Sequence, residues 1–392
     1  MLRGVAVMGI LAANVAAFAL PVAAYLSPAA WGGSRGADLV AWAVNFVVIE
    51  GKMRGLFSAL FGASMLLVIE RAHAAGEDAA QVHFMRMGTL FAIGLVHLYL
   101  IWWGDILTLY ALVGVLAWPL HRLRLRWLIA LGVALIGVET LMSAGLWRAA
   151  LAAAPRATAA DAQFWASLST GFGVPPAADL RAEIAANRSL AGALAWRWEH
   201  ATSPLSALLV IGAETLGYML LGMAGLRSGF LTGAWPAARY RRWAAVTLAI
   251  GWPAFALLAA LTIAHGFDLR YVMFGALVAA APLRPVLVAG YAALVMLAMR
   301  PGGWLTRRVA AAGRTAFTNY LGSSIVMTAL FYGLGLFGAL SRAQLMLLVP
   351  LAWIVMLAWS KPWLDRFRYG PLEWLWRSLA RLEVQPLRRS DQ

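Results

Sequence analysis

The chain has 392 residues, of which 62% are hydrophobic and only 12% are charged. An average soluble domain is about 25% charged, so the composition excludes a soluble globular protein and indicates a polytopic membrane protein. A net charge of +15 would suggest nucleic-acid binding in a soluble chain. In a membrane protein the same charge first reflects the positive-inside rule, and we expect no nucleic-acid partner. The absence of Cys excludes disulfides, thiolate metal sites and a cysteine nucleophile, and we expect no metal.

Mostly apolar segments recur along the whole chain and are separated by polar or Pro- and Gly-rich stretches. A transmembrane helix needs roughly 20 apolar residues. The segments predicted to span the membrane are residues 4–24, 55–69, 87–103, 105–120, 127–146, 204–226, 243–264, 286–299, 315–336 and 343–359. We therefore predict an all-α protein with about ten transmembrane helices, forming one transmembrane domain over residues 1–392.

Two of these segments allow a second interpretation. Residues 22–24 resemble a small-residue cleavage site, so a cleavable signal peptide is the alternative to a first span. Pro282 and Pro285 interrupt the apolar stretch 271–299, and proline removes helical hydrogen bonds. This pattern predicts a short outer helix followed by a short or broken span over residues 286–299.

The distribution of basic residues predicts the orientation. Placing both termini in the cytoplasm puts most of the 32 Lys and Arg on the cytoplasmic side. Residues 147–203 then form an extracytoplasmic loop, in which we expect one or two short helices at the membrane interface. Residues 361–392 form a cytoplasmic tail with a short amphipathic helix, on which the spacing of Glu373 and Arg377 predicts an ion pair.

Two ionisable residues lie at or near membrane depth. His97 and Asp105 flank the junction of two predicted spans that no polar loop separates. Such a group costs roughly 2.5–3.5 kcal/mol to insert, so a functional site is the first hypothesis. The alternative is a histidine bonded to a backbone carbonyl and an aspartate that caps the next helix. Asp105 can orient His97 or hold a cation, and we expect a cluster with Lys52 and Arg54 at the outer rim.

Five stretches resemble, in order, the YeiB-like bacterial membrane proteins, also called domain of unknown function 418. They are residues 3–14, 51–62, 97–110, 313–320 and 369–377. The resemblance covers nearly the whole chain and implies a multi-pass protein of the bacterial cytoplasmic (inner) membrane. In that family a longer amino terminus usually precedes the first motif, which implies a natural start upstream of Met1.

A more distant resemblance connects this family to transmembrane acyltransferases, which include the acyltransferase-3 proteins and the heparan glucosaminide N-acetyltransferase. These enzymes move an acyl group from cytoplasmic acyl-CoA to a glycan hydroxyl or amine across the membrane. Acyltransferase-3 proteins carry an Arg followed eleven positions later by a His, whereas here Arg3 is followed by Asn14. The glucosaminide branch also has Asn at that position, with its His in the next outer loop. No His lies between Asn14 and Lys52 here, so His97 is the candidate for that role.

The first functional hypothesis is therefore a membrane acyltransferase with acyl-CoA, such as acetyl-CoA, as co-substrate and a glycan or lipid-linked acceptor. Acyl transfer needs a base with a pKa near 7 and donors for an oxyanion, which suits His97 as base, Asp105 as orienting residue and Asn14 as oxyanion or acceptor contact. The candidates for binding CoA are Arg3, Arg86, Arg122, Arg314, Asn319 and Tyr320. The positive-inside rule explains the arginines without a ligand.

The alternative hypothesis is a transporter or flippase. In that case His97, Asp105 and Glu214 form a substrate-binding or proton-coupled set in mid-membrane. Membrane lipids are partners under either hypothesis. The sequence leaves open whether the protein forms a homodimer.

Overall fold

The computed structural model describes residues 1–153, 158–200 and 203–389, and the regular elements in them are helices, with η marking short 3₁₀ or π segments. The first half contains α1 (Leu2–Ala19), η1 (Val22–Tyr25), α2 (Gly36–Val44), η2 (Asn45–Ile49), α3 (Lys52–Ala74), α4 (Ala79–Val96), η3 (His97–Ile101), α5 (Leu107–Ala117), η4 (Trp118–Leu120), α6 (Leu125–Ala153), α7 (Ala159–Phe172), α8 (Ala177–Asn187) and α9 (Leu190–Glu199). The second half contains α10 (Pro204–Arg227), α11 (Ala237–Ala264), α12 (Leu269–Met273), η5 (Phe274–Ala279), α13 (Ala280–Ala298), α14 (Trp304–Arg314), α15 (Ala316–Thr328), η6 (Ala329–Gly333), α16 (Arg342–Arg366) and α17 (Pro371–Arg381). The predicted all-α fold is confirmed.

Within the described residues, eight helical segments are long and apolar enough to cross a membrane. They are α1, α2 to α3, α4 to η3, α6, α10, α11, α12 to α13, and α16. The chain is therefore a polytopic membrane protein, with fewer full-length spans than the ten predicted. The predicted span 105–120 is a shorter apolar helix, because the chain is not helical between Trp102 and Ile106. The predicted span 315–336 is replaced by α15 and η6, whose polar side chains lower its hydropathy.

The prediction of a short or broken span over residues 286–299 is wrong. Helices α12, η5 and α13 form one segment, Leu269–Ala298, of 30 residues. The π turn η5 directly precedes the prolines at positions 282 and 285. Its wider i→i+5 hydrogen bonding lets the helix continue although the prolines have no backbone N–H to donate.

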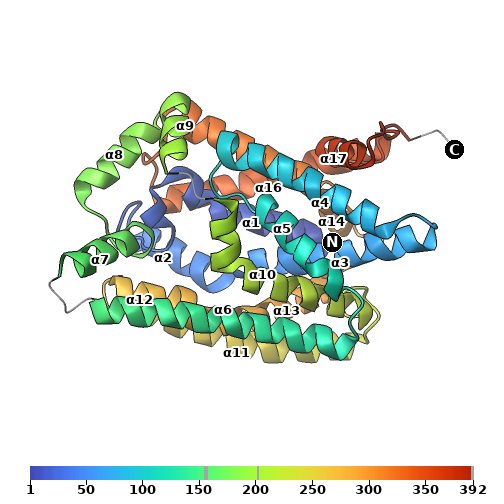
Figure 1. The fold of residues 1–392 in the computed structure, drawn as a ribbon, viewed down its shortest axis with the longest axis horizontal. Coiled ribbons are helices and arrows are strands. Elements are labelled where there is room, and N and C mark those ends of the chain that lie inside the picture. Colours follow the sequence, from blue (N-terminus) through green and yellow to red (C-terminus); the bar gives the residue numbers. More distant parts are fainter. Residues whose placement is uncertain (154–157, 201–202, 390–392) are drawn as a thin grey trace.

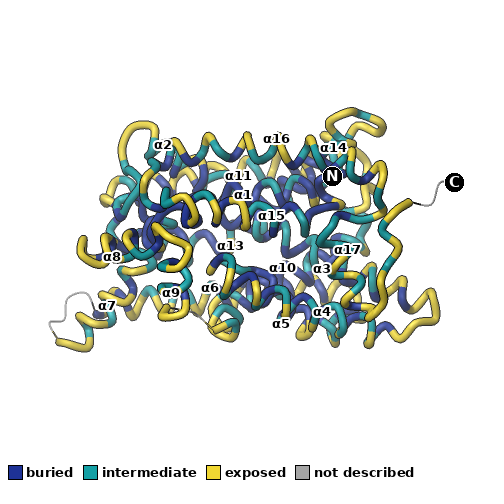
Figure 2. Tube along the Cα trace, turned by 90° about the horizontal axis from the view of Figure 1, so that it is seen from above, coloured by how far each residue is buried: buried dark blue, intermediate teal, exposed yellow. Residues whose placement is uncertain are grey.

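Helix α1 is the centre of the bundle. Fourteen of its 18 residues are buried, and it contacts α3, α14, α15 and α16. In Figure 2 the buried trace runs through α1, α13 and α10, while exposed residues follow the outer edges of the molecule. A cleaved signal peptide would leave this core open, so the position of α1 favours a retained helix.

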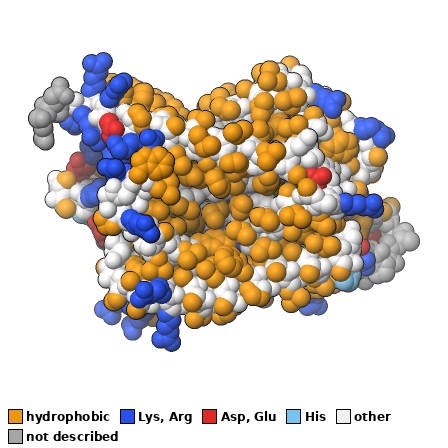
Figure 3. Space-filling model, turned by 180° about the vertical axis from the view of Figure 1, so that it is seen from behind, with side chains coloured by type: hydrophobic (Ala, Val, Ile, Leu, Met, Phe, Trp, Pro, Cys, Tyr) orange, Lys and Arg blue, Asp and Glu red, His pale blue; other side chains and the backbone are white. Residues whose placement is uncertain are grey.

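The two ends of the molecule differ in structure and charge. One end, called here the basic end, carries the N-terminus, α17 and the turn between α3 and α4 (Figure 1). Helices α7, α8 and α9 lie at the opposite end, called here the loop end. Figure 3 shows a wide hydrophobic belt between the ends and the densest group of Lys and Arg at the basic end. This arrangement matches the charge asymmetry expected of a membrane protein.

The long segment between α6 and α10 contains more helix than predicted. Helix α6 extends to Ala153, beyond the predicted end of its span, and three helices follow instead of one or two. They pack on the loop end of the bundle: Glu183 of α8 accepts a hydrogen bond from the backbone N–H of Val22 at 2.9 Å, and Arg197 of α9 donates to the carbonyl of Tyr99 at 3.4 Å.

Glycines allow α3 and α10 to pack with their backbones in contact. A Cβ atom at Gly222 would overlap the backbone carbonyl of Ala59, and one at Gly62 would overlap the backbone of Met219. Small residues permit this close approach in membrane bundles, where packing and hydrogen bonding drive helix association. The α3–α10 contact holds α3 in place, and α3 supplies much of the site described below.

We expect Gly222→Ala to lower the free energy of unfolding by about 1–3 kcal/mol, because the added methyl group forces the two helices apart. The measurement is thermal unfolding of the purified protein in one detergent. Gly137→Ala on α6 is the matched control, since a Cβ there meets no atom within 4 Å. Equal unfolding temperatures for the two variants would contradict the packing argument.

Candidate functional site

His97 and Asp105 form a buried pair at a break between two helices. Helix α4 passes into the π turn η3 at His97, and α5 begins two residues after Asp105. His97 Nδ1 lies 2.8 Å from Asp105 Oδ1, and both side chains are fully buried. The same carboxylate accepts hydrogen bonds from the backbone N–H groups of Leu107 and Thr108 at 3.0 and 2.8 Å. Asp105 therefore both caps α5 and orients the imidazole.

The other ring nitrogen of His97 is free for chemistry. Nε2 is buried and has no hydrogen-bond partner among the described residues. The ring of Tyr320 lies 5.3 Å from the imidazole, centroid to centroid, and the Tyr320 hydroxyl is also buried without a partner. A neutral histidine that donates from Nδ1 to a carboxylate presents Nε2 as an acceptor, which is the form that acts as a general base.

A cavity of about 290 Å³ leads from the basic end toward this pair. Its walls come from α1, α3, α4, α5, α14, α15, α17 and the residues just before α17. Tyr320 and Leu107 both line it. The Tyr320 ring lies beside the His97 imidazole, and Leu107 is two residues from Asp105 in the sequence. The inner end of the cavity is thus one side chain away from the His97–Asp105 pair.

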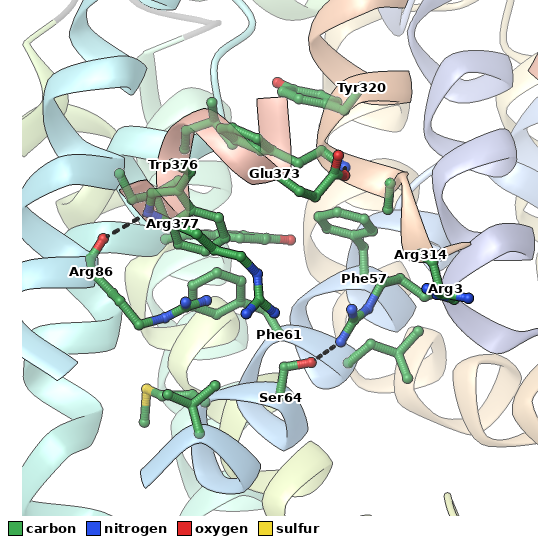
Figure 4. A pocket seen from close by; sticks show the side chains of 18 of the residues that line it. Arg3, Phe57, Phe61, Ser64, Arg86, Arg314, Tyr320, Glu373, Trp376 and Arg377 are labelled. Atoms are coloured by element: carbon green, nitrogen blue, oxygen red, sulfur yellow. Dashed lines mark hydrogen bonds between the residues drawn. The ribbon is translucent and has the colours of Figure 1, made fainter. Parts of the chain in front are cut away.

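The lining of the cavity combines arginines with aromatic and other apolar side chains (Figure 4). Most of the arginines are exposed and form the mouth, whereas the buried apolar side chains form the depth. Its five arginines are Arg3, Arg86, Arg314, Arg368 and Arg377. The apolar part includes Phe57, Phe61, Leu90, Leu107 and Tyr110. Arg86 lies over the ring of Trp376, 4.3 Å from its centroid, and the Trp376 indole donates to the Arg86 carbonyl at 3.1 Å. Such a lining fits a ligand with an anionic head and an apolar extension.

Glu373 is the one carboxylate among the described residues that line this cavity. It accepts from the backbone N–H groups of Phe317 and Thr318 at 2.7 and 3.1 Å, and from the Thr318 hydroxyl at 2.6 Å. It therefore caps α15 from a distant part of the chain. The predicted Glu373–Arg377 ion pair does not form, because Arg377 lies over the ring of Tyr369 instead. Burial raises the pKa of the Glu373 carboxyl, and its hydrogen bonds to Thr318 act in the opposite direction.

Four of the six residues predicted to bind CoA line the cavity: Arg3, Arg86, Arg314 and Tyr320. The other two lie elsewhere. Arg122 is exposed, in the turn after η4. Asn319 is buried on the opposite face of α15, where its amide donates to the Ala312 carbonyl and its oxygen accepts from the Trp359 indole. One helical position separates Asn319 from Tyr320 and turns the two side chains to different faces.

The predicted cluster of Lys52, Arg54 and Asp105 is wrong. Asp105 is occupied by His97 and the start of α5. Lys52 donates to the carbonyl of Phe46 and lies 3.3 Å from the ring centroid of Phe255. Arg54 pairs with Glu214 at 2.5 Å. Because Glu214 is taken by Arg54, the structure does not assemble the set of His97, Asp105 and Glu214 that the transporter hypothesis requires.

Asn14 has no clear function in this arrangement. It is half-buried on α1, makes no side-chain hydrogen bond to the described residues and does not line the cavity. Among the described residues no three His, Asp or Glu side chains are close enough together to hold a metal ion.

Sequence reasoning missed several residues that line the cavity. Arg368, Trp376 and Arg377 belong to the predicted cytoplasmic tail, for which the sequence indicates no part in a cavity. Phe57, Phe61 and Ser64 follow one another on one face of α3. Their spacing was a usable signal, since positions i, i+4 and i+7 share a helix face, but aromatic residues on an apolar helix do not stand out from core residues.

We expect Glu373→Ala to lower the free energy of unfolding by about 1–2 kcal/mol, because the amides at the start of α15 lose their acceptor. Thermal unfolding in detergent measures this. Glu383→Ala, also in the tail but exposed, is the control and should change stability by no more than about 0.5 kcal/mol. Equal stability of the two variants would mean that Glu373 does not hold α15.

Comparison with known proteins identifies relatives of nearly full length. Residues 226–383 match the family described as "Protein of unknown function (DUF418)". The chain is 34% identical over 393 residues to the "Uncharacterized protein YeiB" of Escherichia coli (strain K12), covering 96% of this chain and 94% of that protein. It is 30% identical over 413 residues to the "Uncharacterized protein YxaH" of Bacillus subtilis (strain 168), covering 100% and 95%. No solved structure matches the chain significantly. The family resemblance predicted from five stretches is confirmed, and the chain belongs to the DUF418 family.

Proposed function

We propose that the protein is a membrane acyltransferase that moves an acyl group, such as acetyl, from cytoplasmic acyl-CoA to an extracytoplasmic glycan or lipid-linked acceptor. The observation that carries the proposal is the position of the His97–Asp105 pair. Its free Nε2 lies just beyond the inner end of a cavity with an arginine-rich mouth. The mouth and the buried pair match the two ends of an acyl-CoA, namely its phosphates and its thioester.

The donor fits the cavity by charge and polarity. Three arginines, Arg3, Arg314 and Arg377, come from separate parts of the chain and suit the phosphate groups of CoA. The pantetheine arm is long and mostly apolar, and Phe57, Phe61 and Leu90 offer it an apolar path inward. The thioester then reaches the region of Tyr320 and Leu107, where small movements of these side chains bring it to His97.

The reaction needs only groups present at this point. His97 Nε2 removes the proton from the acceptor hydroxyl or amine as its oxygen or nitrogen forms a bond to the thioester carbon. The carbonyl oxygen becomes an oxyanion, for which the unpartnered Tyr320 hydroxyl is the nearest donor. The intermediate then releases CoA thiolate, which takes the proton back from His97. Asp105 stabilises the imidazolium formed between these steps.

The same proposal includes orientation and location. The basic end faces the cytoplasm, where acyl-CoA is available, in agreement with the positive-inside rule. The loop end faces the acceptor. We assign the protein to the bacterial cytoplasmic (inner) membrane, and the bacterial origin of its relatives supports this assignment.

The first test compares wild type with His97→Ala in detergent, by calorimetry with acetyl-CoA and by release of free CoA, with water as the acceptor of the acetyl group. We expect both proteins to bind acetyl-CoA, and the variant to release CoA about 10²- to 10⁴-fold more slowly, because the base is lost. His73→Ala, an exposed histidine at the basic end, should behave like wild type. No saturable binding, or unchanged release in His97→Ala, would refute the proposal.

The second test concerns the arginines at the mouth. Arg377→Gln should raise the dissociation constant for CoA about tenfold or more, since a charge-assisted contact to phosphate is lost. Arg122→Gln removes the same charge from a position outside the cavity and should leave it nearly unchanged. Equal effects of the two substitutions would indicate a diffuse electrostatic attraction with no defined CoA site.

A further inference from the structure

A second buried polar group lies beyond the apolar floor of the cavity. Glu214 on α10 bonds through one oxygen to Arg54 of α3, at 2.5 Å, and through the other to Arg284 of α13, at 3.1 Å. Arg54 occupies the same face of α3 as Phe57 and Phe61, one turn past the end of the cavity. Tyr110 packs on both phenylalanines and separates the cavity from this cluster.

Two further carboxyls and a phenol belong to the cluster. Glu50 lies within electrostatic range of Lys52 and Arg284, and Glu139 of α6 within range of Glu214. Tyr218, one turn from Glu214 on α10, packs against Gly55. Within the described residues, five of the eleven buried side-chain atoms without a hydrogen-bond partner are in this cluster. They are Arg54 Nη1, Arg284 Nε, Glu50 Oε2, Glu139 Oε2 and the Tyr218 hydroxyl.

Unpartnered buried atoms on this scale call for an explanation. Native proteins pair nearly all their buried polar groups, and each unpaired one costs free energy that a ligand or ordered water recovers. A structural ion pair alone would leave few such atoms, because side chains that only hold helices together satisfy one another. The concentration of unpartnered donors and acceptors therefore indicates a binding site.

The backbone at this point is also interrupted. Residues 50 and 51 separate η2 from α3, Gly51 has a φ of +71°, and no side chain caps the start of α3. Arg284 packs directly against Gly51 and donates to the carbonyl of Ala276 in the π turn η5. Interrupted helices at membrane depth occur where the backbone is buried in protein or lines a polar cavity, and in transporters they form substrate sites.

The chemistry of the cluster selects a class of ligand. Its unpartnered atoms include donors on both arginines and acceptors on Glu50 and Glu139. Its three basic side chains, Lys52, Arg54 and Arg284, equal in number its three carboxyls, Glu50, Glu139 and Glu214. Balanced charges give no advantage to an anion or a cation, whereas donors beside acceptors match a hydroxyl group, which is both.

We propose that this cluster binds an uncharged molecule with several hydroxyl groups, namely a sugar or polyol unit. The way in is at Arg54, whose side chain is 22% exposed although it does not line the basic cavity. The site is linked to the His97–Asp105 pair through α5. Ser58, one turn from Arg54, bonds to the Tyr110 hydroxyl at 2.7 Å, and Tyr110 lies in the first turn of α5, the helix that Asp105 caps. The identification of this molecule as the acyl acceptor rests on the proposed function.

Binding is tested in lipid nanodiscs without acyl-CoA, with methyl glucoside, N-acetylglucosamine, inositol and glycerol as uncharged probes. The charged probe is glucosamine, a cation that the arginines of the basic cavity repel. We expect saturable binding of at least one uncharged probe, measured by calorimetry, and weaker binding of glucosamine. Tyr218→Phe removes one hydroxyl and keeps the ring, and should weaken binding about three- to tenfold. Glu50→Gln, which keeps the shape of the side chain, serves as the second variant and should act in the same direction.

Tyr99→Phe is the matched control, because Tyr99 packs on Trp198 at the loop end, away from the cluster, and it should bind like wild type. The proposal is overturned if no uncharged probe binds, if glucosamine binds more tightly, or if both cluster variants bind like wild type. None of these results depends on acyl-CoA, whereas the His97→Ala experiment needs no sugar. A failure of one proposal is therefore distinguishable from a failure of the other.

Discussion

The hydrogen bond between His97 and Asp105 joins two helices at the point where the chain stops being helical inside the bundle. A break of this kind leaves backbone amides and an imidazole to be satisfied without water. One carboxylate meets both needs: it caps the first turn of α5 and fixes the orientation of the imidazole. Because the carboxylate takes Nδ1, the second nitrogen is left without a partner among the described residues. The cavity approaches this pair through Tyr320 and Leu107.

Much of the fold follows from composition. Long apolar runs with basic flanks predict helices that cross a membrane, and all the predicted spans lie on helical segments. The predicted boundaries of the spans are wrong where two local features of the sequence point to different structures. Two prolines predicted a broken span, but the helix continues through them after the π turn η5. The apolar stretch after Asp105 predicted a full span, but the loss of helix at Trp102 to Ile106 shortens it. The positions of Pro and Gly in a sequence do not show whether a neighbouring π turn changes the backbone hydrogen bonding around a proline.

The site was predictable to a different extent. An ionisable residue in an apolar segment is conspicuous, so His97, Asp105 and Glu214 were found from the sequence alone. Their partners were not. Their shared position at the predicted outer rim suggested that Lys52 and Arg54 meet Asp105, whereas Arg54 pairs with Glu214, 160 positions away. Arg284 completes that cluster from a third helix. Such pairing depends on which helix faces meet, and a single sequence contains that information only weakly.

The cavity is built from both ends of the chain. Arg3 comes from the first turn of α1, while Glu373, Trp376 and Arg377 come from the last helix, α17. Contacts between residues so far apart in sequence form late, because a long loop must close before they contribute any free energy. This cavity is consequently among the last parts of the molecule to exist during synthesis. A chain that stops short of α17 lacks the cap on α15 and one wall of the cavity. Completion of the tail thus determines when the cavity first has all its walls.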